Sequence, residues 1–170
     1  MVITSCRLLS GLPGTGPVPR YCHGGTPTPW REGVVIEMLC DDGSSFIVNF
    51  EADSHLCHRC VRYWSEAPAV FVNADGAGYL VSAVDPERYT FMGTVDTFVF
   101  AGKRLVVADR FAVSAYDANL SRVWEREICA TNGVHLHRVV GAVVQGSIFD
   151  VGCEEPIPLR LNLDTGADLR

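Results

Sequence analysis

Short runs rich in β-branched and aromatic residues recur along most of this sequence, at a spacing of roughly ten residues. Two of them, 34–40 and 46–50, flank a segment that contains Asp42-Gly43, and two β-rich runs joined by such a segment predict a hairpin. Several short strands separated by Gly, Asn or Asp are typical of an antiparallel sandwich, barrel or propeller-like sheet. Further runs occupy 69–72, 79–84, 97–101, 104–108, 112–116, 122–128, 134–140, 142–149 and 157–163.

The N-terminal segment lacks this pattern, because glycine and proline interrupt it too often for a regular element to continue. We therefore predict an extended, irregular arm over 1–32, with one short strand inside 2–9 and with Tyr21 and Trp30 as apolar anchors. The remainder, 33–170, is predicted to form a single antiparallel β domain.

One segment departs from the two-residue alternation of strands. Apolar residues at positions 57, 60, 61 and 64 follow helical spacing, Asp53 or Ser54 suits an N-cap, and Pro68 suits a stop. These features predict one short helix near 54–65, with its apolar stripe packed on a sheet because so short a helix is marginal alone.

A weak repeat marks the C-terminal half. The strand-like 104–108 leads to Tyr116-Asp117, a turn and a run containing Trp124, and 161–166 partly repeats this order about one repeat length later. Residues 104–166 thereby resemble blades of quinoprotein-type and WD-like β-propellers, in which a tryptophan fills the wedge between sheets. A closed propeller needs at least four blades, so we predict a mainly β fold of antiparallel sheets packed as an open propeller-like sandwich.

Charge and hydropathy narrow the function classes. The formal net charge is −6, with 14 basic and 20 acidic residues, so no basic footprint for nucleic acid is expected. No apolar run approaches the roughly 18 residues of a membrane helix, and the first residues lack the apolar core of a signal peptide. With seven cysteines, an odd number, these features predict a cytoplasmic protein with mostly buried, reduced thiols.

The Cys57-x-x-Cys60 pair is the sequence feature that most resembles a reactive or metal-binding site. If it begins a helix, its first thiol would face the helix dipole and become more acidic, which favours redox activity. A structural zinc site is the second interpretation, in which Cys22 and His23 of the arm complete the ligand set of Cys57 and Cys60. The alternative without chemistry is that both thiols belong to the buried apolar stripe of the predicted helix.

His135 and His137 alternate along a predicted strand, so their side chains face the same side. A solvent-facing row is the expected arrangement, and a two-histidine metal site with an unidentified third ligand is the alternative.

No nucleophile elbow or complete phosphate loop occurs in the sequence. We therefore predict a non-enzymatic β-sheet scaffold or protein-interaction module without a cofactor, which binds a protein partner or forms a homodimer. The alternatives are a metal- or thiol-dependent protein using Cys57 and Cys60, with structural zinc favoured over redox catalysis, and a small-ligand pocket between two sheets under the arm. Aromatic residues dominate interfaces, and the candidate contacts, each equally suited to a core, are Tyr21, Trp30, Trp64 and Tyr79.

Overall fold

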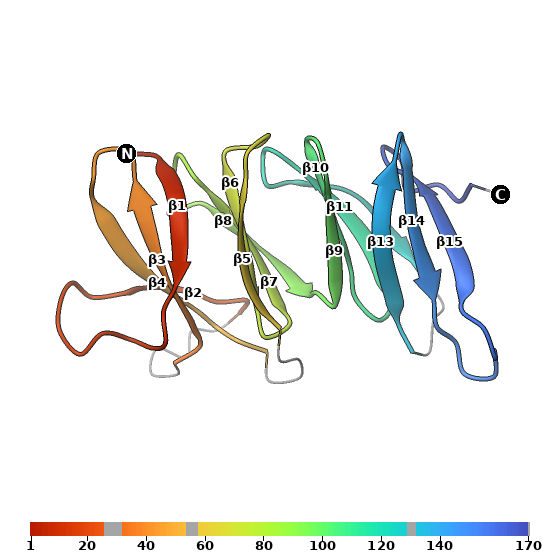
Figure 1. Cartoon of the computed structure of the whole chain (residues 1–170), viewed down its shortest axis with the longest axis horizontal. Helices are drawn as coiled ribbons and strands as arrows, with labels where there is room; N and C mark the ends of the chain where they lie inside the picture. Colours follow the sequence, from red (N-terminus) through yellow and green to blue (C-terminus); the bar gives the residue numbers. More distant parts are fainter. Residues whose placement is uncertain (26–31, 54–57, 129–131, 170) are drawn as a thin grey trace. The chain divides into compact units, whose positions relative to one another are not determined.

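The computed structural model describes residues 1–25, 32–53, 58–128 and 132–169, and every regular element within them is a β-strand (Figure 1). Contacts divide the chain into two compact units, Met1–Thr94 and Val95–Arg170. The first unit contains β1 (Ile3–Leu8), β2 (Arg20–Cys22), β3 (Val34–Cys40), β4 (Ser45–Phe50), β5 (Arg59–Trp64), β6 (Ala69–Ala74), β7 (Ala77–Ser82) and β8 (Tyr89–Thr94). The second contains β9 (Thr97–Ala101), β10 (Arg104–Ala108), β11 (Ala112–Asp117), β12 (Arg122–Glu127), β13 (Val134–Val140), β14 (Val143–Ile148) and β15 (Ile157–Asn162).

The first sheet of the N-terminal unit has the strand order β1-β3-β4-β2. The predicted hairpin is confirmed, because β3 and β4 pair antiparallel from Leu39 opposite Ser45. Gly43 closes their turn with a φ of 79°, a left-handed conformation that glycine adopts without a steric penalty. Strand β1 pairs antiparallel with β3, and β2 pairs parallel with β4.

The second sheet of this unit, β5-β6-β7-β8, is a meander of antiparallel neighbours. Asp75 and Gly76 join β6 to β7 with φ values of 52° and 102°, as a tight type I′ hairpin turn requires. The Asn73 side chain accepts a hydrogen bond from the Gly76 N–H over 2.8 Å, which holds the turn. Strands β6 and β7 are buried at every position.

The core of the N-terminal unit lies between its two sheets. Alternate residues of β6 and β7 pack against the inner face of β3 and β4, and Ile3 of β1 joins them. The Phe50 and Tyr79 rings meet at a centroid distance of 5.2 Å. The Ile3 N–H also donates to the Ala83 carbonyl over 2.8 Å, so a backbone hydrogen bond adds to apolar packing.

The C-terminal unit also consists of two sheets, with the strand orders β12-β11-β10-β9 and β13-β14-β15. Its core includes Val106, Leu136 and Leu161, all of them buried. The Trp124 indole N–H of β12 donates to the Leu163 carbonyl over 2.8 Å. The ring also lies so close to Gly166 that a Cβ there would contact it at 2.6 Å.

The predicted helix near 54–65 is wrong for the part described, because Arg59–Trp64 is strand β5; residues 54–57 lie outside the described residues. A strand forms here because β6 is fully buried and both of its edges need hydrogen-bonding partners, which β5 and β7 supply. Arg59 adds an ion pair with Asp75, 2.8 Å long. Tertiary pairing therefore overrides a local spacing that also suits a helix.

The N-terminal segment is more regular than predicted. The short strand expected within 2–9 is confirmed as β1, but the segment also contributes β2, so it is not irregular throughout. The contacts divide the chain after Thr94, whereas the sequence predicts an arm of 1–32 and one domain over 33–170. Over the described residues there is no helix long and apolar enough to cross a bilayer.

Replacing Gly33 with alanine should destabilise the protein, because a Cβ there would overlap the backbone carbonyl of Phe50, which belongs to β4. Overpacking of this kind typically costs about 1–3 kcal/mol. Urea denaturation of Gly33→Ala should show this loss in the free energy of unfolding. Gly14→Ala is the matched control, since a Cβ at Gly14 meets no atom within 4 Å. Equal stability of the two variants would contradict the packing of Gly33 against β4.

Candidate functional site

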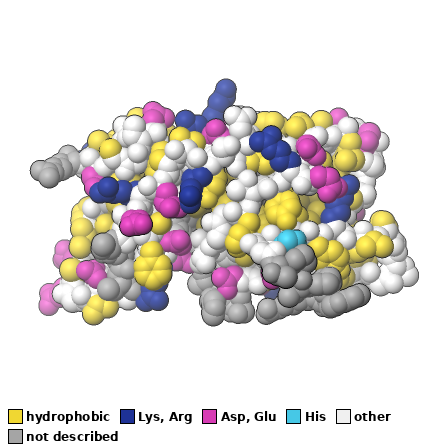
Figure 2. Space-filling view, turned by 180° about the vertical axis from the view of Figure 1, so that it is seen from behind, with side chains coloured by type: hydrophobic (Ala, Val, Ile, Leu, Met, Phe, Trp, Pro, Cys, Tyr) yellow, Lys and Arg dark blue, Asp and Glu magenta, His cyan; other side chains and the backbone are white. Residues whose placement is uncertain are grey.

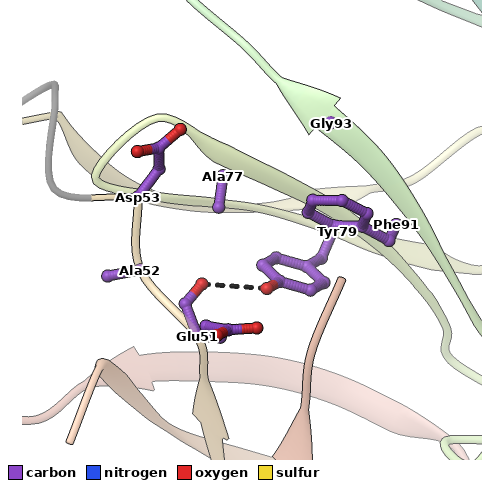
Figure 3. A pocket seen from close by; sticks show the side chains of 7 residues that line it. All are labelled: Glu51, Ala52, Asp53, Ala77, Tyr79, Phe91 and Gly93. Atoms are coloured by element: carbon purple, nitrogen blue, oxygen red, sulfur yellow. Dashed lines mark hydrogen bonds between the residues drawn. The ribbon is translucent and has the colours of Figure 1, made fainter. Parts of the chain in front are cut away.

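A pocket of about 200 Å³ opens between the two sheets of the N-terminal unit (Figure 3). Its walls come from the segment that follows β4, from the start of β7 and from β8. Two aromatic residues and two acidic residues contribute to the lining, so the pocket combines apolar surface with negative charge. The lining residues are Glu51, Ala52, Asp53, Ala77, Tyr79, Phe91 and Gly93.

Tyr79 forms the inner wall of the pocket. Its hydroxyl donates a hydrogen bond to the Glu51 backbone carbonyl over 2.8 Å, which ties β7 to the chain leaving β4 (Figure 3). Burial raises the pKa of Tyr79, and the negative charge of nearby Glu51 raises it further. The phenol therefore stays protonated and acts as a hydrogen-bond donor near neutral pH.

Phe91 forms the outer aromatic wall. Its ring centroid lies 5.3 Å from that of Tyr79, and 41% of the residue is exposed. The β7–β8 register shifts between Gly78 and Tyr79, which sets Phe91 directly opposite Tyr79. Gly24 lies against this ring, because a Cβ there would overlap it. The N-terminal segment therefore packs against Phe91.

Glu51 and Asp53 bring two carboxylates to the pocket. Glu51 Oε2 accepts a hydrogen bond from the Gly24 N–H over 3.3 Å, and Asp53 Oδ2 accepts one from the Thr94 hydroxyl over 3.4 Å. The Asp53 N–H donates to the Ala74 carbonyl over 3.1 Å, which fixes the backbone beside the hairpin of β6 and β7. A cation in this pocket would therefore meet carboxylate oxygens and aromatic faces together.

The residues of the predicted zinc site are only partly described. Cys22 is the last residue of β2, His23 follows it, and Cys60 lies within β5. Cys57 lies outside the described residues, so the zinc site of Cys57, Cys60, Cys22 and His23 stays a prediction. No cluster of three or more His, Cys, Asp or Glu residues suited to a metal occurs in the part of the chain that the structure describes.

Three thiols of the N-terminal unit, those of Cys6, Cys22 and Cys60, are poorly placed for nucleophilic chemistry. Burial raises the pKa values of Cys6 and Cys22 to about 12, and it also raises the pKa of Cys60. Because Cys60 lies in a strand, it receives no acidifying effect from a helix terminus. Cys6 instead contacts the Met38 sulfur at 3.3 Å, as a core residue does.

The aromatic residues that were candidates for interface contacts differ in their exposure to solvent. Trp64 and Tyr79 are buried, which favours the core interpretation of both, although Tyr79 also lines the pocket. Tyr21 is 40% exposed, and Trp30 lies outside the described residues.

Sequence reasoning missed Glu51, Asp53 and Phe91. The two carboxylates follow the end of a predicted strand, which is a local signal for a sheet-edge site. Nothing local places Phe91 beside Tyr79, because that neighbourhood depends on the shifted register between β7 and β8.

His135 and His137 lie on β13 with exposed side chains, so the predicted solvent-facing row is confirmed. Their ring centroids are 5.1 Å apart.

The chain matches no known protein family, and none of the curated proteins is significantly similar to it.

The raised pKa of Cys22 predicts a loss of stability in alkali. A thiol in water has a pKa of 9.0 and the folded Cys22 thiol a pKa of about 12, so the folded state retains a proton that the unfolded state releases. The free energy of unfolding should therefore be unaffected below pH 9 and fall as the pH rises from about 9 to about 12. Urea denaturation across this range should show a shallower fall for Cys22→Ala, whereas Cys153→Ala, at an exposed thiol, should follow the parent protein. Parallel curves for Cys22→Ala and the parent would contradict the prediction.

Proposed function

We propose that this chain is a non-enzymatic interaction module that receives a lysine side chain of a protein partner in the pocket beside Tyr79. The observation that carries the proposal is the combination of two aromatic rings and two carboxylates around one small opening. Aromatic faces attract an ammonium group through their quadrupole, and carboxylates attract it through charge. The two effects act on the same ligand group.

The size of the pocket supports a side chain as its occupant. Sites for drug-sized ligands and cofactors are typically about 300–1,000 Å³, and this one is about 200 Å³. A lysine side chain places an apolar stem against the rings while its ammonium group remains near the carboxylates. The exposure of Phe91 leaves the opening accessible from solvent.

Charge supports the same partner chemistry. The formal net charge of −6 favours encounter with a basic segment. On the face in Figure 2, acidic side chains are spread among basic and hydrophobic ones. A partner with an exposed lysine would therefore be attracted by the net negative charge of the protein.

An open propeller-like sandwich is part of the proposal as the scaffold that holds the pocket. It is supported by the order of the strands, because β5–β8, β9–β12 and β13–β15 each form one sheet of sequential neighbours, as propeller blades do.

A cytoplasmic location is also part of the proposal. It is supported by the free thiols of Cys6, Cys22, Cys40, Cys60 and Cys153.

The proposal predicts binding of a short peptide with one lysine. In an NMR titration of the full chain, the peptide should shift the amide signals of Ala77, Tyr79 and Gly93, while a peptide with norleucine in place of lysine should not. Asp53→Asn should weaken binding several-fold, because one attractive charge is lost, and Phe91→Ala should weaken it about two- to five-fold through loss of the cation–π contact.

Glu66→Gln is the control for net charge, since Glu66 lies after β5, at the end of the second sheet opposite to the pocket. It should bind the lysine peptide as the parent does. Equal responses to the lysine and norleucine peptides, or binding that Asp53→Asn leaves unchanged, would overturn the proposal.

A further inference from the structure

A pair of histidines on β13 brings two ring nitrogens close together. The Nδ1 atoms of His135 and His137 are 3.4 Å apart, and the planes of their rings are inclined by 51°. Both side chains are exposed. Two nitrogens thus face each other at the surface of the C-terminal unit, and neither histidine is among the residues of the Tyr79 pocket.

A β-bulge lies at this pair. Leu136 lies opposite Gly146 and Arg138 lies opposite Gln145, so His137 is the extra residue of β13. A bulge changes the direction in which a side chain projects, and the His137 ring lies beside that of His135 at this bulge. Gly146 permits the close approach of the strands at this point, because a Cβ there would lie 2.6 Å from the His135 carbonyl oxygen.

The backbone on either side of His135 is held in place by Thr97 of β9. The Thr97 hydroxyl accepts a hydrogen bond from the Leu136 N–H over 3.1 Å and donates one to the Val134 carbonyl over 3.4 Å. These bonds fix the segment that carries His135. The pair is therefore built on a restrained strand rather than on a loop.

Ser147 orients the second ring. His137 Nε2 lies 2.8 Å from the Ser147 hydroxyl oxygen, and Ser147 is the residue opposite His135 in the β13–β14 register. When Nε2–H donates to this hydroxyl, the lone pair of the ring resides on Nδ1, which faces His135. A partner of this kind is what metal-binding histidines use to set their tautomer and ring orientation.

We infer that His135 and His137 chelate a divalent transition-metal ion such as Zn²⁺ through their Nδ1 atoms. Zinc–imidazole bonds of about 2.0–2.1 Å in tetrahedral geometry place two ligand nitrogens about 3.3–3.4 Å apart, which is the separation found here. At 3.4 Å a direct N–H···N hydrogen bond would be weak, so it does not explain the arrangement as well.

The remaining coordination positions would be taken by water, since no third His, Cys, Asp or Glu completes a cluster within the described ranges. Imidazole is a suitable ligand for Zn²⁺, Cu²⁺ and Ni²⁺ alike. With two protein ligands the site would bind its metal reversibly and leave positions open to a further ligand. It is distinct from the predicted zinc site at Cys57 and Cys60, because it uses neither those residues nor their unit.

The test is a titration of the full chain with Zn²⁺, followed through the imidazole ¹H–¹⁵N signals of the histidines. We expect the signals of His135 and His137 to shift together, with Nδ1 as the metal-bound nitrogen in both rings. His135→Asn and His137→Asn should each weaken binding at this site at least about ten-fold, and Ser147→Ala about ten-fold through loss of the orienting hydroxyl.

His58→Asn is the matched control, since His58 is exposed and lies in the other unit, near Cys60. It should leave the affinity at His135 and His137 unchanged even if zinc also binds to cysteine. Circular dichroism verifies that each variant is folded. The inference is overturned if Zn²⁺ does not shift the two histidine signals up to millimolar concentration, if Nε2 is the nitrogen that binds, or if either asparagine variant retains parental affinity.

Discussion

Hydrogen bonding of buried backbone is the constraint on which the rest of the structure depends. Strands β6 and β7 are buried at every position, so each of their peptide groups needs a partner within the protein. Strands β6 and β7 form backbone hydrogen bonds with each other along one edge. Strands β5 and β8 supply the hydrogen-bonding partners of their outer edges. This requirement makes residues 59–64 a strand, and it holds Tyr79 where its ring reaches both the core and the pocket.

Both candidate sites lie at an interruption of regular strand pairing. In β8 the shifted register places Phe91 opposite Tyr79, and in β13 the extra residue is His137, whose ring lies beside that of His135. Without the shift in the β7–β8 register, Phe91 would not lie directly opposite Tyr79. Glycine permits close contact at both places, at Gly24 against the Phe91 ring and at Gly146 opposite the bulge.

The resemblance of 104–166 to propeller blades and the observed sheets have the same local origin. Tyr116-Asp117 ends β11, and the Asp117 side chain accepts hydrogen bonds from the Asn119 and Ser121 N–H groups, at 2.9 and 3.1 Å. Such a turn suits any antiparallel hairpin. The Trp124 indole N–H connects β12 to the residue that follows β15, through the Leu163 carbonyl.

The sequence by itself determined the β class, the 34–50 hairpin and the common face of His135 and His137, because turn chemistry and two-residue periodicity are local properties. Only tertiary structure decided that 59–64 is a strand, since the deciding factor is the unsatisfied edge of β6, which is formed by residues further along the chain. Tertiary structure likewise decided the pocket and the approach of the two histidine rings. Both depend on register, and register is set by pairing between strands rather than by the residues of one strand.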